Sequence, residues 1–284
     1  MVNRACLGGI VVGDGLPVAV SGVLNVSPES FYQGSVVTEE DRLRRAGEAM
    51  ARAGAAFVEV GAMSTAPYLA TRITEDQEAD RLAWAVDLLA RTLDRPVSAD
   101  TSRSAPARAA LDAGARIIND VTGLTGDPEI ASLVARSEVG LILMASERHG
   151  IPRDDAALHV HDLLAQSLDL ARTAGVDPSL IAVDPGIGFF RNQRIPWHAW
   201  DCAVLAALPR LRSLGHPVCV GVSRKSFIGA ITGRDDPAER LPGSLAATAA
   251  AVMGGAQLIR AHDVPETVQA VRVAEAIRRA SVEA

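Results

Sequence analysis

The amino-acid sequence predicts an α/β protein, a (β/α)8 TIM barrel that forms one domain over residues 1–284. Three observations support this fold class. Short runs rich in β-branched residues alternate with longer amphipathic segments, eight such runs can be counted, and no linker or low-complexity tract interrupts the alternation. Strands that are apolar on both faces and alternate with helices belong in a parallel sheet, and eight such repeats close most naturally into a barrel.

The predicted elements follow one another in a regular order. The barrel strands are expected at residues 18–26, 57–62, 97–101, 116–120, 140–145, 180–185, 218–223 and 257–263. Amphipathic helices are expected at residues 38–55, 75–93 and 158–175, and an Ala-rich, tightly packed helix that ends in glycine at residues 243–256. Residues 1–16, ahead of the first strand, are expected to form an extra hairpin or plug.

Composition narrows the class of protein. The chain has 284 residues, of which 48% are hydrophobic, so it is large enough to bury a sizeable core. A net charge of −6 argues against a broad surface for polyanions, and nucleic acid is not an expected partner. A local anion pocket needs only two or three positive groups and stays possible.

The cysteines and the lengths of the apolar runs indicate the cellular compartment of the protein. Cys6, Cys202 and Cys219 are far apart and have no metal-type spacing, so we expect free thiols in a reducing cytoplasm. Nowhere does the sequence contain an uninterrupted apolar stretch of about 18 residues. We therefore expect neither a signal peptide nor a membrane span.

Polar residues follow most of the predicted strands, and in a barrel of this type the loops after the strands build the site. They are Asn25, Ser64 with Thr65, Asp100, Asn119 with Asp120, Asp184, Lys225, and Arg260 with His262. Each one alone could be an ordinary helix cap or turn residue. Together they would converge on one mouth, where unpaired buried charges are costly and need a ligand or one another.

Lys225 is the only lysine in the chain, and the other 27 of the 28 Lys and Arg residues are arginine. An Ala- and Arg-rich composition of this kind is typical of codon bias, so one remaining lysine could be chance. A compact ammonium is not interchangeable with a planar guanidinium in a tight pocket, however, and retention for binding is the second interpretation.

The residue types indicate the kind of ligand. A carboxylate accepts two adjacent N–H groups from an amino-pyrimidinone edge, while an amide and an ammonium suit ring acceptors, so a pterin or a purine fits. Arg260 and His262 are two apart on a strand and would face the same side as an anion site, unless they only cap the barrel rim. The long loop at residues 24–35 is expected to be a mobile lid that carries Asn25.

Six segments, in order along the chain, resemble the signature motifs of the dihydropteroate synthase family. They are "GVLNVSPESF", "ADTSRSAPARAALDAGARIINDVTG", "VDPGIGF", "GVSRKSFIG", "GSLAATAA" and "IRAHDV". The resemblance covers nearly the whole chain. Enzymes of that family join 6-hydroxymethyl-7,8-dihydropterin pyrophosphate to para-aminobenzoate and release pyrophosphate, in folate biosynthesis.

The resemblance implies a role for each residue of the site. Asp100, Asn119 and Asp184 would hold the pterin edge, with Lys225, assisted by Ser223, on its oxo and ring-nitrogen side. Asn25, Arg260 and His262 would hold the pyrophosphate with a Mg²⁺ ion, for which Asn25 is the metal residue. Ser64, Thr65, Pro67, Phe189 and Ser226 would shape the arylamine pocket. The resemblance also implies a homodimer and a dissociative reaction, in which pyrophosphate leaves before the amine attacks.

The chain departs from the family pattern on the amine side. Met63 and Ala66 stand where the second loop of the family has an acid and an arginine, Ala145 and Ser146 replace a His and a Met, and Arg191 replaces a lysine. The alternatives are therefore a synthase that uses a different arylamine and a pterin-binding protein with little catalysis. A pterin-binding methyltransferase is disfavoured, because it has no need of a pyrophosphate site.

Overall fold

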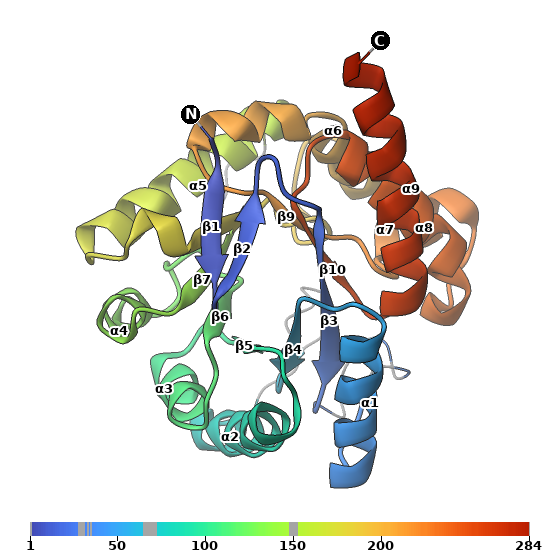
Figure 1. Ribbon diagram of the computed structural model, residues 1–284. Coiled ribbons are helices and arrows are strands. Elements are labelled where there is room, and N and C mark those ends of the chain that lie inside the picture. Colours follow the sequence, from blue (N-terminus) through green and yellow to red (C-terminus); the bar gives the residue numbers. More distant parts are fainter. Residues whose placement is uncertain are drawn as a thin grey trace.

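A computed structural model describes residues 2–27, 32, 34, 36–64, 73–147 and 153–283, with side chains up to residue 280. Eight parallel strands form its barrel (Figure 1). They are β3 (Ala19–Asn25), β4 (Phe57–Gly61), β5 (Val97–Asp100), β6 (Ile117–Asp120), β7 (Gly140–Met144), β8 (Ile181–Asp184), β9 (Cys219–Gly221) and β10 (Leu258–Ala261). Each lies within two residues of its predicted bounds, so the expected fold class is confirmed.

The strands are hydrogen-bonded in the order β8-β7-β6-β5-β4-β3-β10-β9. A parallel bridge between Val183 and Val218 joins the two ends of this series, and the Val183 N–H donates to the Pro217 carbonyl at 2.9 Å. This bridge brings β8 beside β9 and completes the ring. Because all eight strands are parallel, their carboxyl ends open at one end of the barrel.

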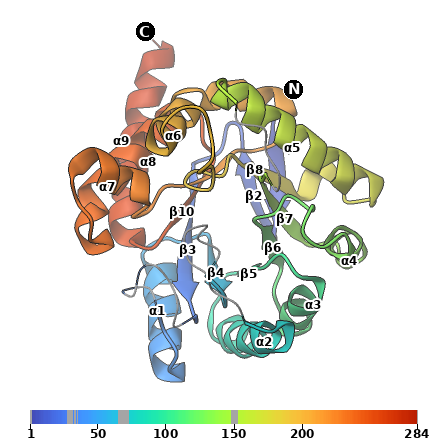
Figure 2. The ribbon, with the colours of Figure 1, turned by 180° about the vertical axis from the view of Figure 1, so that it is seen from behind.

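Helices surround the barrel (Figures 1 and 2). They are α1 (Glu40–Arg52), α2 (Glu75–Thr92), α3 (Ser104–Asp112), α4 (Glu129–Ser137), α5 (Ala156–Thr173), α6 (Trp197–Ala206), α7 (Ser226–Thr232), α8 (Leu241–Met253) and α9 (Val264–Glu283), with short 3-10 turns η2 (Pro178–Leu180), η3 (Leu208–Leu214) and η4 (Pro237–Arg240). Local chemistry sets their ends. Before α2, Thr74 and Gln77 form a reciprocal capping box.

An antiparallel hairpin precedes the barrel, as expected, and consists of β1 (Arg4–Leu7) and β2 (Ile10–Gly13). It lies across the front of the barrel in Figure 1. At its turn Gly8 has a φ of +57°, and a Cβ there would lie 3.0 Å from the Pro96 side chain. Leu7 and Val12 pack with Ile117 in a buried cluster, so the hairpin plugs the amino-terminal end of the barrel.

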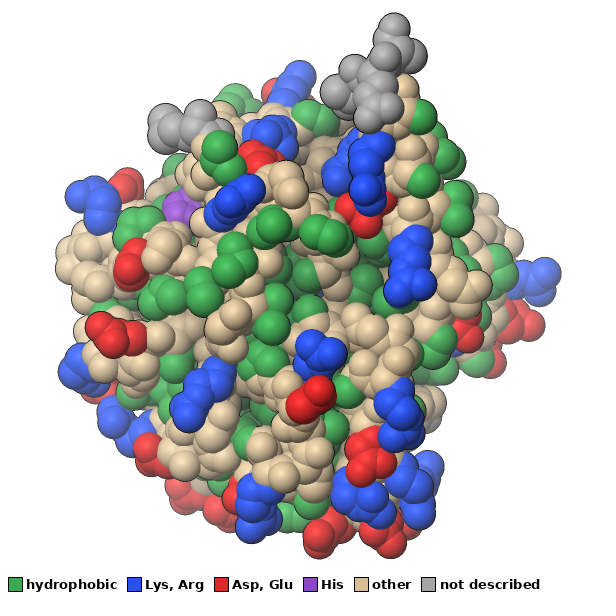
Figure 3. All heavy atoms as spheres, viewed as in Figure 1, with side chains coloured by type: hydrophobic (Ala, Val, Ile, Leu, Met, Phe, Trp, Pro, Cys, Tyr) green, Lys and Arg blue, Asp and Glu red, His purple; other side chains and the backbone are tan. Residues whose placement is uncertain are grey.

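Three expectations from the sequence concern the surface charge, the cysteines and membrane spans. Basic side chains are interspersed with Asp and Glu side chains around the hairpin face in Figure 3. Cys6, Cys202 and Cys219 are free, as expected. Among the described residues, none of the helices combines the length and the apolar character that crossing a bilayer requires.

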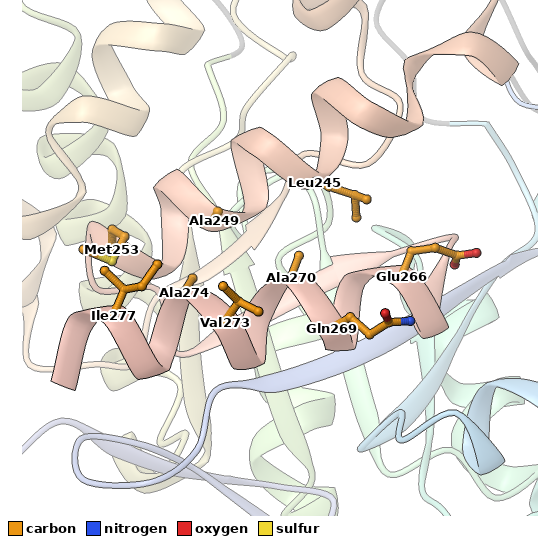
Figure 4. A pocket seen from close by; sticks show the side chains of 9 residues that line it. All are labelled: Leu245, Ala249, Met253, Glu266, Gln269, Ala270, Val273, Ala274 and Ile277. Atoms are coloured by element: carbon orange, nitrogen blue, oxygen red, sulfur yellow. The ribbon is translucent and has the colours of Figure 1, made fainter. Parts of the chain in front are cut away.

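An apolar groove of about 460 Å³ lies between α8 and α9 (Figure 4). Its lining includes Met253, Val273 and Ile277, which are 44%, 61% and 56% exposed. The groove lies on the outer helical layer and contains none of the predicted site residues.

Candidate active site

The structure places most of the predicted site residues at the carboxyl ends of the strands. Asn25, Asp100 and Asp184 are the last residues of β3, β5 and β8, and Lys225 is the cap residue before α7. Asn119 and Arg260 lie within β6 and β10, and Ser64, Ser223 and His262 lie just beyond strand ends. Thr65 and Pro67 fall outside the described residues, as does Ala66.

Asp100, Asn119, Arg260 and a residue that was not predicted, Glu59, form one buried network. Arg260 Nε donates to Glu59 Oε1 at 3.0 Å, and its Nη2 contacts the same oxygen and donates to Asp100 Oδ2 at 3.2 Å. Asn119 Nδ2 also donates to Glu59 Oε1, at 3.4 Å. The strand register explains the grouping, because Asp100 is paired directly with Asn119 across β5 and β6.

Asp100 is the electrostatically unusual member of this network. Burial raises its pKa to about 7, and the nearby Glu59 charge adds to the rise while Arg260 opposes it. Its Oδ1 atom is buried and has no hydrogen-bond partner among the described residues. A buried oxygen without a donor is costly, so this atom is suited to accept an N–H from a ligand.

Asp184 and Lys225 form a second group, on the β8 and β9 side of the mouth. Asp184 Oδ1 accepts from the Gly186 N–H at 2.8 Å. Lys225 Nζ donates to the Ile187 carbonyl and lies 4.7 Å from the centre of the Phe189 ring. Burial lowers the pKa of Lys225 to about 8, and the Asp184 charge opposes that shift. Burial raises the pKa of Asp184, which Arg260 and Lys225 oppose.

Ser223 and His262 form a third group. Ser223 Oγ lies 3.0 Å from His262 Nδ1 and accepts from the His262 backbone N–H at 3.2 Å. Burial lowers the pKa of His262 to about 4, and although Asp263 opposes the shift, the imidazole is neutral at pH 7. A neutral imidazole offers one N–H donor rather than a full positive charge.

Arg191 and Ser226 meet on the side predicted for the arylamine. Arg191 Nη2 donates to Ser226 Oγ at 2.6 Å, and its guanidinium carbon lies 4.0 Å from the Trp197 ring centre. Ser226 directly follows Lys225 in the chain, and the centre of the Phe189 ring lies 4.7 Å from Lys225 Nζ. Ala145, one of the departures from the family pattern, is fully buried.

Two features of the mouth differ from the sequence interpretation. Asp120 is not part of the network, because its oxygens accept from the Thr122 and Leu124 backbone N–H groups and the Thr122 hydroxyl. Its role is to cap the turn after β6. Glu59 was missed, although a carboxylate inside the apolar strand "FVEVG" is a usable signal, since a lone buried charge needs a partner.

The fold and this site define a pterin-binding enzyme. A family model described as "Pterin binding enzyme" matches residues 21–262. The dihydropteroate synthase of Mycobacterium leprae is 40% identical over 269 residues, which are 90% of this chain and 92% of that protein. The chain belongs to the dihydropteroate synthase family, whose members are transferases.

Solved structures agree with this assignment. The Xanthomonas albilineans dihydropteroate synthase with 4-aminobenzoic acid has a TM-score of 0.86 and 35% identity, and the match covers 98% of this chain and 99% of that one. The Burkholderia cenocepacia enzyme complexed with 7,8-dihydropteroate has a TM-score of 0.85 and 34% identity, with both chains covered to 100%.

Proposed function

We propose that the barrel mouth binds 6-hydroxymethyl-7,8-dihydropterin pyrophosphate and joins it to para-aminobenzoate, with release of pyrophosphate. The observation that carries the proposal is the unpartnered Asp100 Oδ1 beside the Asn119 amide, at the carboxyl ends of adjacent strands. Family members with solved structures bind 4-aminobenzoic acid and 7,8-dihydropteroate, which are the amine and the product of that reaction.

The pterin edge would be held by Asp100, Asn119 and Asp184. Asn119 Nδ2 donates to Glu59, so the Oδ1 atom of Asn119 would accept an N–H from a ligand. Glu59 thereby orients the amide. Asp100 Oδ1, which has no partner among the described residues, would accept a neighbouring N–H. Asp184 would accept the adjacent N–H groups of the amino-pyrimidinone edge through the oxygen that Gly186 does not use.

Lys225 would donate to the oxo and ring-nitrogen side of the pterin. Its ammonium lies in the field of Asp184, which favours the charged form. A guanidinium at this position would be broader and planar and would not fit the same approach beside the Phe189 ring. Ser223 would support this side of the ring.

The diphosphate would be bound by Asn25, Arg260 and His262. Mg²⁺ is usually held by one or two protein oxygens together with substrate phosphates and water. The described residues include no cluster of three or more His, Cys, Asp or Glu that could form a metal cage, and a single amide oxygen from Asn25 fits the substrate-assisted mode. The metal would supply positive charge that neutralises the departing diphosphate.

These roles suit a dissociative reaction. The bond between the pterin methylene carbon and the diphosphate oxygen breaks, and the electron pair leaves with the diphosphate. The amine nitrogen then forms the new C–N bond and loses a proton. Asp100 and Asp184 would stabilise the positive charge on the pterin in a buried site, where fixed charges act most strongly.

The amine would bind against Ser64, Phe189 and Ser226, with Thr65 and Pro67. Arg191 donates to Ser226 Oγ, which places its guanidinium beside the position expected for the carboxylate of para-aminobenzoate. It would compensate for the arginine that the second loop lacks at Ala66. We also propose, from the family resemblance, a homodimer and a cytoplasmic location.

The direct test is incubation of the purified chain with the pterin pyrophosphate, Mg²⁺ and para-aminobenzoate, followed by quantification of pyrophosphate and dihydropteroate. We expect the two products in equal amounts when both substrates are present, and no dihydropteroate when the amine is omitted. Product formation only with a different arylamine would move the assignment to that amine. Tight pterin binding without turnover would contradict catalysis.

A further inference from the structure

The loop between β8 and α6 is held by side chains at three successive backbone groups. The Ile187 carbonyl accepts from Lys225 Nζ. The Gly188 N–H donates to Asp201 Oδ1 at 2.8 Å, and the Gly188 carbonyl accepts from Arg191 Nε at 3.2 Å. The position of the Lys225 ammonium therefore depends on the conformation of Ile187 and Gly188.

Gly188 packs directly against the Lys225 stem. It has a φ of +84°, and a Cβ at this position would lie 3.0 Å from Lys225 Cδ. The absence of a side chain thus serves two purposes, a left-handed backbone conformation and close approach to the lysine. A bond that fixes the Gly188 peptide also fixes one wall of the space in which Lys225 lies.

Asp201 provides that bond from behind the pocket. It lies in the middle of α6 and is 0% exposed, and its second oxygen, Oδ2, has no hydrogen-bond partner among the described residues. Burying a carboxylate with one oxygen unsatisfied is costly, and an uncharged amide could also accept from Gly188. Hydrogen bonding alone therefore does not account for a carboxylate at this position.

The charges that act on Lys225 supply a second reason. Asp184 and Asp201 favour the protonated ammonium, whereas Arg260 and Arg191 disfavour it. Burial raises the pKa of Asp201 to about 6, against the opposing effect of the Gly188 hydrogen bond, so its carboxylate is ionised where Lys225 titrates. Asp201 is one of two negative charges that offset two guanidinium groups.

We propose that Asp201, outside the binding pocket, is a positioning residue for Lys225: it fixes Gly188 against the lysine stem and balances the charge of the ammonium. This inference rests on the proposed function, since it assigns Asp201 a role through Lys225. It deepens that function, because it identifies what keeps the single lysine both charged and in place.

The chain offers an unusually clean test. Because Lys225 is the only lysine, protein labelled with ¹³C-lysine and carrying no lysine in any tag gives one Cε resonance, which reports the protonation of Lys225 directly. We expect the Asp201→Asn substitution to lower the pH of the titration midpoint by roughly half a unit or more. Asp14→Asn, at the hairpin end, is the matched control and should leave the midpoint unchanged.

A binding measurement separates the hydrogen bond of Asp201 to Gly188 from the effect of its charge on Lys225. Asp201→Asn retains an acceptor for Gly188, whereas Asp201→Ala removes it, so we expect calorimetric affinity for the pterin pyrophosphate at pH 7 to fall several-fold more in the alanine variant. In the Asn variant the alkaline limb of kcat/KM should shift down with the NMR midpoint.

Two results would overturn the proposal. The first is a Lys225 titration that is identical in the wild-type chain and the Asp201→Asn variant. The second is an alanine variant with native circular dichroism that binds the pterin as tightly as the Asn variant does. An inactive wild-type chain would contradict the proposed function and leave the NMR midpoint still informative about Asp201.

Discussion

Each end of the barrel holds a partly buried aspartate among polar groups, and the two aspartates have opposite pKa shifts. At the hairpin end, Asp14 accepts from the Asn3 N–H at 3.2 Å, from Arg212 at 3.1 and 2.9 Å, and from Gln257 at 2.8 Å. Burial alone would raise the pKa of Asp14, but these hydrogen bonds outweigh it and lower the pKa. At the mouth, Asp100 has a raised pKa and one oxygen without a partner.

The difference in hydrogen bonding between Asp14 and Asp100 indicates that Asp14 contributes to stability and Asp100 to ligand binding. Both carboxylate oxygens of Asp14 accept hydrogen bonds from the protein, so the ionised form stabilises the fold. These oxygens are therefore not suited to binding a ligand. Asp100 shares Arg260 with Glu59 and retains unused hydrogen-bonding capacity, which weakens the folded state and suits binding. Substitutions at the mouth should therefore change activity more than stability, and those at the hairpin end the reverse.

The largest effect is expected from Lys225→Arg. The guanidinium should collide with or misalign against the pterin ring beside Phe189, so kcat/KM should fall by roughly a hundredfold or more, with a nearly unchanged melting temperature. Steady-state kinetics and thermal unfolding monitored by circular dichroism measure the two effects. A kcat/KM close to that of the wild-type chain would refute the role of Lys225.

Asp100→Asn sharpens the comparison, because stability and activity should move in opposite directions. A folded-state pKa near 7, above the ordinary 3.8, means that Asp100 favours folding below about pH 4 and that this contribution is lost as the pH rises through 7. The substitution should therefore raise the melting temperature at pH 8 and weaken pterin binding. A lower melting temperature at pH 8 would show that the Arg260 contact outweighs the burial of the charge.

Asp14→Asn should show the opposite pattern. Its lowered pKa means that the stabilisation is present above about pH 4 and is lost as the pH falls below that value. Loss of the charged hydrogen bonds should lower the free energy of unfolding by about 1–2 kcal/mol at pH 7, with kcat/KM unchanged. Urea titrations at pH 7 and pH 3 test this, and an equal loss at both values would contradict it.

The smallest effect is expected from Asp87→Asn on the outer surface of α2. Asp87 accepts from Arg91 one helical turn away, but their side chains are 47% and 69% exposed. Solvent screening limits such pairs, so the free energy of unfolding should change by less than about 0.5 kcal/mol. The change measured for this variant is the reference against which the other changes in unfolding free energy are judged. A larger change would show that exposed ion pairs also stabilise the fold.

Sequence reasoning found the residues with a local signal. Strand ends marked by Asn25, Asp100 and Asp184 are visible because an apolar run stops at a polar residue. Glu59 and Asp201 do not stand at the end of an apolar run. Glu59 lies inside strand β4, and Asp201 lies in the middle of helix α6. Their importance depends on partners, and Arg260, the partner of Glu59, is 201 residues away.

The sequence by itself determined the eight strands, the hairpin and the polar residues that end the strands, because hydrophobic periodicity and chain order are local properties. Only the tertiary structure decided which of those groups are neighbours, that Asp120 caps a turn, and that Asp14 is satisfied where Asp100 is not. The physical reason is that hydrogen-bond satisfaction and burial, which set the pKa of a carboxylate, arise from barrel closure between segments far apart in the chain.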